Sequence, residues 1–134
     1  FPVNTDYTNS DRIKQSRLQS HSIEAAEQCG GTYVPPVDEL SKLTSILKDW
    51  PKDRCLIFCD ENKVGEAVKT FKSSVGDKWA ILIGPEGGFS KNEIKYLKSL
   101  EFVTSISLGP RILRADTAVV AALAIWQKEI GDWK

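Results

Sequence analysis

The sequence is poor in the residues that bind metal ions or form disulfide bonds. Its 134 residues include three cysteines and one histidine, His21. A structural zinc site needs four ligands, mostly closely paired Cys and His, and Cys29, Cys55 and Cys59 do not supply that spacing. The odd number of cysteines also excludes a complete disulfide framework. We therefore expect free thiols, no bound metal and a reducing compartment, the cytoplasm.

The chain also lacks an excess of charge of either sign. Lys and Arg number 18, Asp and Glu number 18, and the formal net charge is zero. Because overall charge supplies no attraction to nucleic acid, any contact with RNA must come from a local patch. No secretory leader is present, and no apolar run is long enough to cross a membrane. These absences favour a globular protein that does not enter a membrane.

Methionine is absent, and the chain begins at Phe1. Since translation starts at methionine, we expect a processed or truncated piece with something missing before Phe1. Residues 1–9 are expected to form a linker or an edge segment. Residues 10–134 are expected to form one domain, a length sufficient for a hydrophobic core.

Apolar runs alternate with amphipathic segments along the chain. Strands are predicted at residues 32–34, 54–59, 79–83 and 103–108. Helices are predicted at about residues 11–28, from Asp38 or Ser41 to Trp50, and at about 64–71, 91–100 and 115–130. Ser90 and Glu93 form the S-x-x-E pattern of a helix N-terminus. The alternation predicts an α/β domain with a mainly parallel sheet flanked by helices.

Two glycine-rich loops are the most informative part of the sequence. Gly-Pro-Glu-Gly-Gly-Phe-Ser at 84–90 follows one predicted strand, and Gly-Pro-Arg-Ile-Leu-Arg-Ala-Asp at 109–116 follows the last. Ligands of open α/β sheets bind beyond the carboxyl ends of strands, and glycine lets a ligand approach the backbone. Each loop alone is equally well explained as an ordinary turn. The pair, with charged residues set among the glycines, favours a binding site.

Several familiar catalytic motifs are absent. The sequence contains no G-x-G-x-x-G fingerprint, no phosphate-binding G-x-x-x-x-G-K loop and no G-x-S-x-G nucleophile elbow. This leaves a cofactor bound mainly by the backbone of the glycine loops. Two alternatives stay open: a nucleotide- or phosphate-binding module without catalysis, and an RNA-binding assembly factor that has lost its chemistry.

The two loops together resemble the signature of the bacterial 16S rRNA uridine-N3 methyltransferases of the SPOUT superfamily. The resemblance is carried by residues 83–90 and 107–118, and Ile-Glu-Ala-Ala-Glu-Gln at 23–28 resembles the family's first-helix motif. It extends in register over roughly residues 10–130. Neither Gly-Pro loop alone would be specific, but the combination is.

The resemblance implies features that the residues alone do not. The fold would be a SPOUT-type α/β domain with a trefoil knot near the C-terminus, a rare exception to ordinary topology. The knot loops would hold S-adenosylmethionine in a bent conformation. The protein would be a homodimer with the helix 115–130 in its interface, acting on 16S rRNA of the small ribosomal subunit. The family also has an N-terminal PUA-type domain, which we expect to be the missing part.

The resemblance also assigns roles to individual residues. The cofactor would lie on the backbone of Leu82, Ile83, Gly84, Pro85, Glu86, Gly87, Gly88, Leu108, Gly109, Ile112 and Leu113. Methylation at N3 develops negative charge on the uracil, which the guanidinium of Arg114 or Arg111 would stabilise. Glu86, Asp116 or a water would take the N3 proton.

Each charged candidate has a plainer interpretation. Arg12 and Arg17, in the first turns of the first predicted helix, together with Arg111, are candidate RNA contacts or simply solvated side chains. Asp116 is a candidate base or the cap of the last helix. Glu86 is a candidate base or a brace of its own loop.

The chain departs from the family in two places. Cys29-Gly30-Gly31 stands where the family commonly has Ser-Gly-Arg. An RNA contact by that arginine would therefore be lost or supplied elsewhere. Asp116 stands where the family often has Glu, which retracts the carboxylate by one methylene.

Overall fold

The computed structural model of the chain describes residues 1–9, 12–65 and 77–133. It divides into two compact units, Phe1–Asp49 and Trp50–Lys134, each of which we describe by itself. Most of the predicted helix at 64–71 lies outside the described residues. No helix of the described part is both long enough and apolar enough to cross a membrane.

The first unit contains two short strands and two helices. β1 (Val3–Asn4) and β2 (Ser41–Lys42) pair in parallel. α1 (Gln15–Gln28) begins later than predicted, and its N-cap residue, Lys14, makes no side-chain capping bond. Arg12 therefore precedes the helix instead of occupying its first turn.

Two predictions for the first unit are wrong. Residues 32–34 form no strand, and the helix predicted from Asp38 or Ser41 is the shorter α2 (Leu43–Lys48). Glutamines of α1 bind the backbone of the segment that follows residue 34. Gln15 Nε2 donates to the Val37 carbonyl at 2.6 Å, and Gln19 Oε1 accepts from the Val37 N–H at 2.8 Å. These side chains satisfy polar groups that a strand would have paired with a neighbour.

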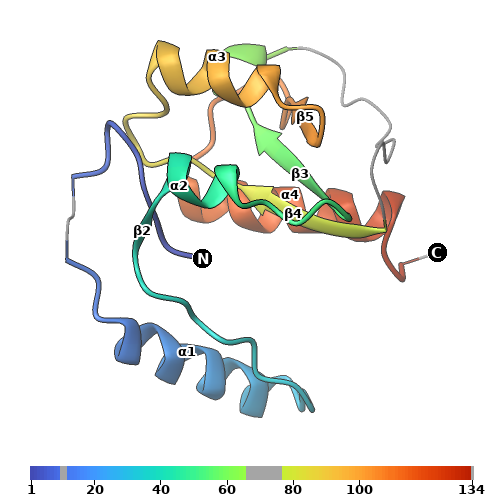
Figure 1. Ribbon diagram of the computed structural model, residues 1–134. Helices are drawn as coiled ribbons and strands as arrows, with labels where there is room; N and C mark the ends of the chain where they lie inside the picture. The colour runs from blue at the N-terminus through green and yellow to red at the C-terminus, as the bar shows by residue number, and fades with distance from the viewer. Residues whose placement is uncertain (10–11, 66–76, 134) are drawn as a thin grey trace. The chain divides into compact units, whose positions relative to one another are not determined.

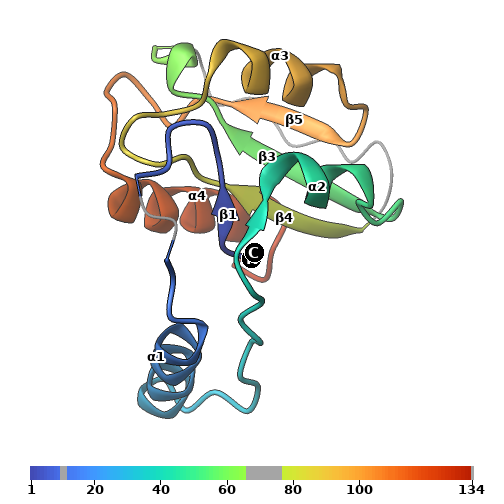
Figure 2. The same ribbon diagram turned by 60° about the vertical axis from the view of Figure 1, so that its left-hand side comes forward.

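The second unit is built on a parallel sheet of three strands. β3 (Arg54–Cys59) lies between β4 (Lys78–Leu82) and β5 (Val103–Ile106). Both neighbours run parallel to β3, so the predicted α/β fold with a parallel sheet is confirmed. α3 (Lys91–Ser99) and α4 (Ala115–Glu129) cover opposite sides of this sheet (Figures 1 and 2).

Successive residues of β3 point into two apolar layers. Ile57 is buried with Ile106 of β5, and Trp126 of α4 packs against them. Phe58 faces the other side, where its ring meets that of Phe89 edge-on, with the centroids 5.1 Å apart. Because both faces are covered, β3 is apolar along nearly its whole length.

The predicted capping box at the start of α3 is confirmed. Ser90 Oγ accepts from the Glu93 N–H at 3.2 Å, and Glu93 Oε2 accepts from the Ser90 N–H at 2.9 Å. Both residues are buried. The reciprocal bonds fix the entry of the chain into α3 and hold Phe89 at the carboxyl edge of the sheet.

Candidate functional site

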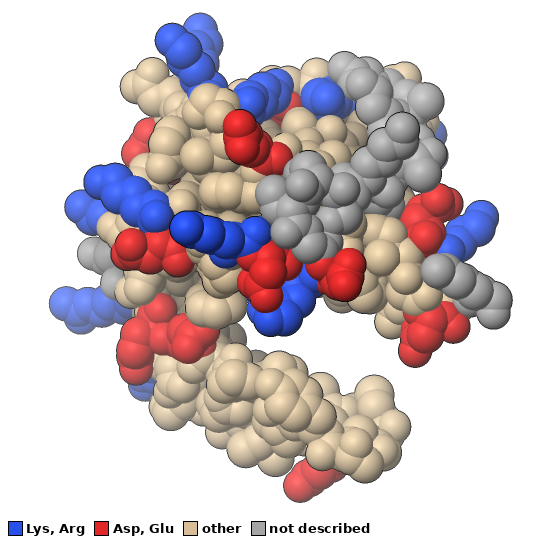
Figure 3. Space-filling model, turned by 45° about the vertical axis from the view of Figure 1, so that its right-hand side comes forward, with Lys and Arg blue, Asp and Glu red and all other residues tan. Residues whose placement is uncertain are grey.

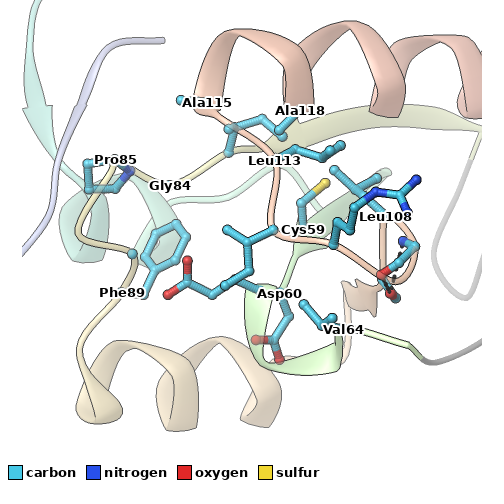
Figure 4. Close-up of a pocket in the computed structure, with 17 residues that line it drawn as sticks. Cys59, Asp60, Val64, Gly84, Pro85, Phe89, Leu108, Leu113, Ala115 and Ala118 are labelled. Carbon is cyan, nitrogen blue, oxygen red and sulfur yellow. Dashed lines mark hydrogen bonds between the residues drawn. The ribbon is translucent and has the colours of Figure 1, made fainter.

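A cavity lies at the carboxyl edge of the second unit's sheet (Figure 4). Three segments line it: the end of β3 with the turn that follows it (residues 59–64), the first Gly-Pro loop after β4 and the second after β5. The start of α4 adds Ala115 and Ala118. The two Gly-Pro loops, far apart in sequence, therefore bound one site, as expected.

Most of the predicted cofactor residues line this cavity. They are Ile83, Gly84, Pro85, Gly88, Leu108, Gly109, Ile112 and Leu113. The others lie outside its wall: Leu82 is buried within β4, and Glu86 and Gly87 are exposed at the tip of the first loop. The backbone at the start and end of that loop, rather than its tip, faces the cavity.

The candidate catalytic pair lies beside the cavity at the start of α4. Arg114 Nη2 and Asp116 Oδ2 are 3.4 Å apart, and both side chains are largely exposed. Asp116 Oδ1 also accepts from the Thr117 N–H at 2.7 Å. The N-cap of α4 is Arg114, so the interpretation of Asp116 as the helix cap is wrong. Neither side chain lines the cavity, but Ala115 between them does.

The candidate RNA contacts are divided between the two units. Arg111 lines the cavity and is exposed, whereas Arg12 and Arg17 are exposed residues of the first unit. On the face shown in Figure 3, Lys and Arg lie among Asp and Glu rather than in one broad basic patch. This face therefore shows no continuous basic surface among the described residues.

The segment after β3 contributes cavity residues that the sequence analysis did not assign. Cys59, Asp60, Glu61 and Val64 all line the wall. A short 3-10 helix, η1 (Glu61–Lys63), forms this turn, and Asp60 caps it by accepting from the Asn62 N–H. Asp60-Glu61-Asn62 is a polar triplet directly after a buried strand. The Gly-Pro loops also follow predicted strands directly. A polar segment in this position could therefore have identified residues 60–62 as part of the site.

Asp60 holds the turn after β3 to the rest of the unit. Its side chain is fully buried, and Oδ2 lies 2.7 Å from Lys98 Nζ of α3. Oδ1 accepts from both the backbone N–H and the side-chain amide of Asn62, each at 3.0 Å, and Ser105 Oγ lies 3.3 Å from Oδ2. Burial raises the pKa of Asp60, but the bonds from Lys98 and Asn62 outweigh it and hold the pKa below its ordinary value.

The second Gly-Pro loop leaves part of its backbone open. Gly109 has φ +113°, and beyond its chain neighbours no heavy atom of the described residues lies within 4 Å of the position that a Cβ would take. The buried hydroxyl of Ser107 accepts from the Gly109 N–H at 3.2 Å, and the Gly109 carbonyl accepts from the Gly65 N–H at 3.1 Å. The loop is fixed from within the protein, yet space remains beside its glycine.

The glycines of the first loop are needed for internal packing. A Cβ on Gly84 would lie 2.6 Å from Cε2 of the Phe89 ring. Gly88 has φ +68°, and a Cβ there would collide with the carboxylate of Glu61. These two glycines therefore admit neighbouring side chains, which is a different reason from the ligand approach that we expected.

Cys59 lies in the cavity wall but is not prepared for nucleophilic chemistry. Burial raises the pKa of its thiol to about 12, so the thiol stays protonated near neutral pH. Among the described residues, no group of three or more His, Cys, Asp or Glu is placed to hold a metal ion.

The cavity is small and mixed in character. Its volume is about 70 Å³. Typical ligand pockets hold roughly 300–1,000 Å³, so a cofactor-sized ligand must extend over the open rim. Ile112 on the second loop is 72% exposed, and the glycine backbones supply polar atoms nearby. An apolar flat group beside such backbone edges is the ligand chemistry that fits.

Comparison with known proteins decides the family. Residues 1–127 match the model of the RNA methyltransferase domain. The chain belongs to this family. The resemblance first carried by the two Gly-Pro loops is thereby confirmed.

Curated relatives share one name, Ribosomal RNA small subunit methyltransferase E. The protein from Buchnera aphidicola subsp. Schizaphis graminum is 52% identical over 125 residues, covering 89% of this chain and 47% of the relative. The protein from Rickettsia conorii is 31% identical over 126 residues, covering 92% and 51%. The chain thus spans about half the length of the curated relatives it matches.

Two solved structures of similar fold contain S-adenosylmethionine. The Neisseria gonorrhoeae Ribosomal RNA small subunit methyltransferase E bound to S-adenosyl methionine aligns with a TM-score of 0.84 at 29% identity, covering 99% of this chain and 55% of that one. A Legionella pneumophila putative methyltransferase in complex with the cofactor aligns with a TM-score of 0.75 at 28% identity, covering 94% and 53%.

The ion pair between buried Asp60 and the partly exposed Lys98 predicts a pH-dependent stability. Since the pKa of Asp60 is lower in the folded than in the unfolded state, its stabilisation is present above about pH 4 and is lost as the pH falls through the folded-state value. We expect Lys98→Met to lower the free energy of unfolding by about 1–3 kcal/mol at pH 7. The deficit should shrink in acid.

Urea unfolding of both proteins between pH 3 and pH 7 measures this effect. Lys95→Met is the matched control, because Lys95 is an exposed residue of the same helix. Its effect should stay within about 0.5 kcal/mol at every pH. A Lys98→Met deficit that does not change with pH would show that the lost packing, not the charge pair, is responsible.

Proposed function

We propose that this chain is the catalytic domain of an S-adenosylmethionine-dependent methyltransferase. Its target would be N3 of a uridine in 16S rRNA of the small ribosomal subunit, in the cytoplasm. The observation that carries the proposal is the cavity between both Gly-Pro loops, in a chain whose structural relatives bind this cofactor. The choice of uridine N3 rests on the family resemblance.

The residues of the cavity fit an adenosyl cofactor. Open space beside Gly109 allows a ligand to lie against the backbone of the second loop. Ile112 and Leu113 supply apolar surface for a flat ring, and carbonyl and N–H groups of the loops supply polar contacts. A pure phosphate site is less well supported, because Arg111 is the one basic side chain in the described wall, and Asp60 and Glu61 are acidic.

When bound, S-adenosylmethionine supplies an activated methyl group, so the protein needs no nucleophile of its own. The protein must orient the uracil and stabilise the charge left when N3 loses its proton. Arg114 is suited to this role because its partner, Asp116, is also exposed and such pairs are weak. Arg114 can turn from Asp116 towards a nucleotide at little cost. Asp116, Glu86 or a water then accepts the proton.

The trefoil knot belongs to the same proposal. A knot needs the C-terminal part of the chain to pass through a loop formed by an earlier part. The turn after β3 contacts the second Gly-Pro loop through the bond from the Gly65 N–H to the Gly109 carbonyl. This close approach of segments more than forty residues apart supports a knotted arrangement around the cavity.

We also propose that α4 forms the interface of a homodimer. Val119, Val120 and Leu123 are exposed on this helix. Beside them is an apolar groove of about 350 Å³ between α4 and β4. Trp126 also lines the groove, and its Nε1 is buried with no hydrogen-bond partner among the described residues. An apolar partner surface with one acceptor would complete this region.

The cofactor proposal predicts that Gly109→Val abolishes binding of S-adenosylmethionine. The branched side chain would fill the space beside the loop and strain a backbone with positive φ. Calorimetric titration with S-adenosylmethionine and ATP side by side measures the effect. The unsubstituted chain should bind the first in preference to the second.

Gly30→Val is the matched control for backbone strain. Gly30 has φ +64° and open space around its Cβ position, but it lies in the first unit. This variant should bear a similar strain and keep its affinity. Equal loss of affinity in both variants, or unchanged affinity in Gly109→Val, would remove the second loop from the cofactor site.

The balance of charge predicts weak RNA methylation by residues 1–134 alone. RNA affinity comes largely from clustered Lys and Arg, whereas here the net charge is zero. We expect the chain to bind S-adenosylmethionine but to transfer labelled methyl groups to purified small subunits poorly. The comparison is with a full-length relative, such as the Bacillus subtilis protein. Equal kcat/KM values would contradict the argument from charge.

The dimer proposal predicts a dimeric mass by sedimentation at micromolar concentration. Val120→Glu, at a position 69% exposed on α4, should give a monomer because it places a charge in the apolar interface. Tyr33→Glu, at a position 71% exposed in the first unit, should leave the dimer intact. A monomeric mass for the unsubstituted chain would exclude the interface.

A further inference from the structure

The turn at residues 60–65 is fixed more firmly than an ordinary surface turn. Asp60 is anchored to α3 by Lys98, and its N–H donates to the Ile106 carbonyl at 3.0 Å. Lys63 Nζ reaches the Ser105 carbonyl at 3.4 Å. The Gly65 N–H donates to the carbonyl of Gly109. Glu61 lies between these anchors, so its backbone position is determined on both sides.

The side chain of Glu61 is directed to the first Gly-Pro loop. Its carboxylate is in close contact with Gly88, occupying the space that a Cβ of Gly88 would need. Glu61 also lines the cavity. Within the described part of the chain, its carboxylate has neither a hydrogen-bond nor an ion-pair partner. Two acceptor oxygens are therefore held at the cavity wall without a donor from the residues that the structure describes.

The two acidic residues of the wall differ in what they offer a ligand. The charge of Asp60 is neutralised by Lys98, and its oxygens accept several bonds within the protein. Among the described residues, no cation pairs with Glu61 and no donor occupies its acceptor oxygens. A ligand group beside Glu61 is favoured if it donates hydrogen bonds, and a phosphate is disfavoured by repulsion between like charges.

We propose that Glu61 determines ligand specificity at this site, accepting hydrogen bonds from hydroxyl or amino groups of a nucleoside ligand and rejecting phosphorylated nucleotides, and that the Asp60–Lys98 pair positions it. The ligand class is a nucleoside with free donors and no phosphate, which includes S-adenosylmethionine and its demethylated product, S-adenosylhomocysteine. The inference rests on the proposed function and deepens it. Asp60 and Lys98 act through Glu61 and are positioning residues.

Calorimetric titration of the chain with S-adenosylmethionine, S-adenosylhomocysteine and ATP tests the role of Glu61. Glu61→Gln keeps the shape and removes the charge. Because bonds to a charged acceptor are the stronger ones, we expect about a tenfold loss of affinity for both adenosyl ligands. Affinity for ATP should rise or stay constant. Glu129→Gln, at an exposed position at the end of α4, is the control and should change none of the three affinities.

The outcomes separate this inference from the proposed function. If the unsubstituted chain does not bind S-adenosylmethionine, the proposed function fails and Glu61 is not involved in the result. If it binds and Glu61→Gln keeps all three affinities, the role of Glu61 is overturned. A loss of affinity confined to S-adenosylmethionine would mean that Glu61 interacts with the sulfonium charge. That result would overturn the proposal that Glu61 accepts hydrogen bonds from the nucleoside.

A double-mutant cycle tests the positioning role of the Asp60–Lys98 ion pair. We expect Lys98→Met to weaken S-adenosylmethionine binding in the original chain and to have no further effect once Glu61 is Gln. Lys95→Met, on the same helix, should have no effect in either background. Asp60→Asn gives a second measurement if Lys98→Met does not fold. Equal losses in both backgrounds would overturn positioning through Glu61.

Discussion

Parallel pairing on both sides of β3 is the constraint on which the rest of the second unit depends. Phe58 is in register with Leu82 of β4, and Cys59 with Ile106 of β5. Because the strands share one direction, the chain leaves all of them at the same edge. Segments beginning at residues 60, 83 and 107 therefore meet, and the cavity is the space between them. Apolar layers on both faces keep the strands in this register.

Glycine serves two different purposes around this cavity. Gly84 and Gly88 make room for Phe89 and Glu61, so their substitution would disturb the wall itself. Gly109 makes room for no side chain of the described residues, and among them the space beside it remains open. Sequence alone could not distinguish a glycine that makes room for a side chain of the protein from one beside open space, since the glycine is the same in both cases. The neighbours that decide the matter are Phe89, five positions after Gly84, and Glu61, 27 positions before Gly88.

What could be predicted from sequence was set by local chemistry. The strand at 54–59 was predicted with its observed bounds, because an uninterrupted apolar run in a parallel sheet has no other simple explanation. The capping box of Ser90 and Glu93 was likewise visible, since both partners lie within one helical turn. The Gly-Pro loops were identified because glycine and proline act on the backbone directly.

The features that could not be predicted depend on contacts with residues distant in sequence. Residues 32–34 have the composition of a strand, but glutamines of α1 satisfy the backbone just beyond them. From its place in the sequence, Asp60 is expected to be a loop residue in contact with solvent. Lys98 is distant in sequence and contacts Asp60 only in the folded structure. The position of Glu61 follows from that of Asp60. It could not be predicted from sequence either, because the contact that fixes Asp60 comes from a residue distant in the chain.

The ion pair of Asp60 also determines the electrostatic character of the cavity. With the charge of Asp60 compensated by Lys98, the charged side chains left in the described wall are Glu61 and Arg111, one of each sign. A polyphosphate would be attracted by one and repelled by the other. S-adenosylmethionine carries both an ammonium and a carboxylate group beside its sulfonium, so both signs can be used. A wall of mixed charge thus suits a zwitterionic nucleoside better than a nucleotide, and the ion pair between buried Asp60 in the wall and Lys98 of α3 is what makes the wall mixed.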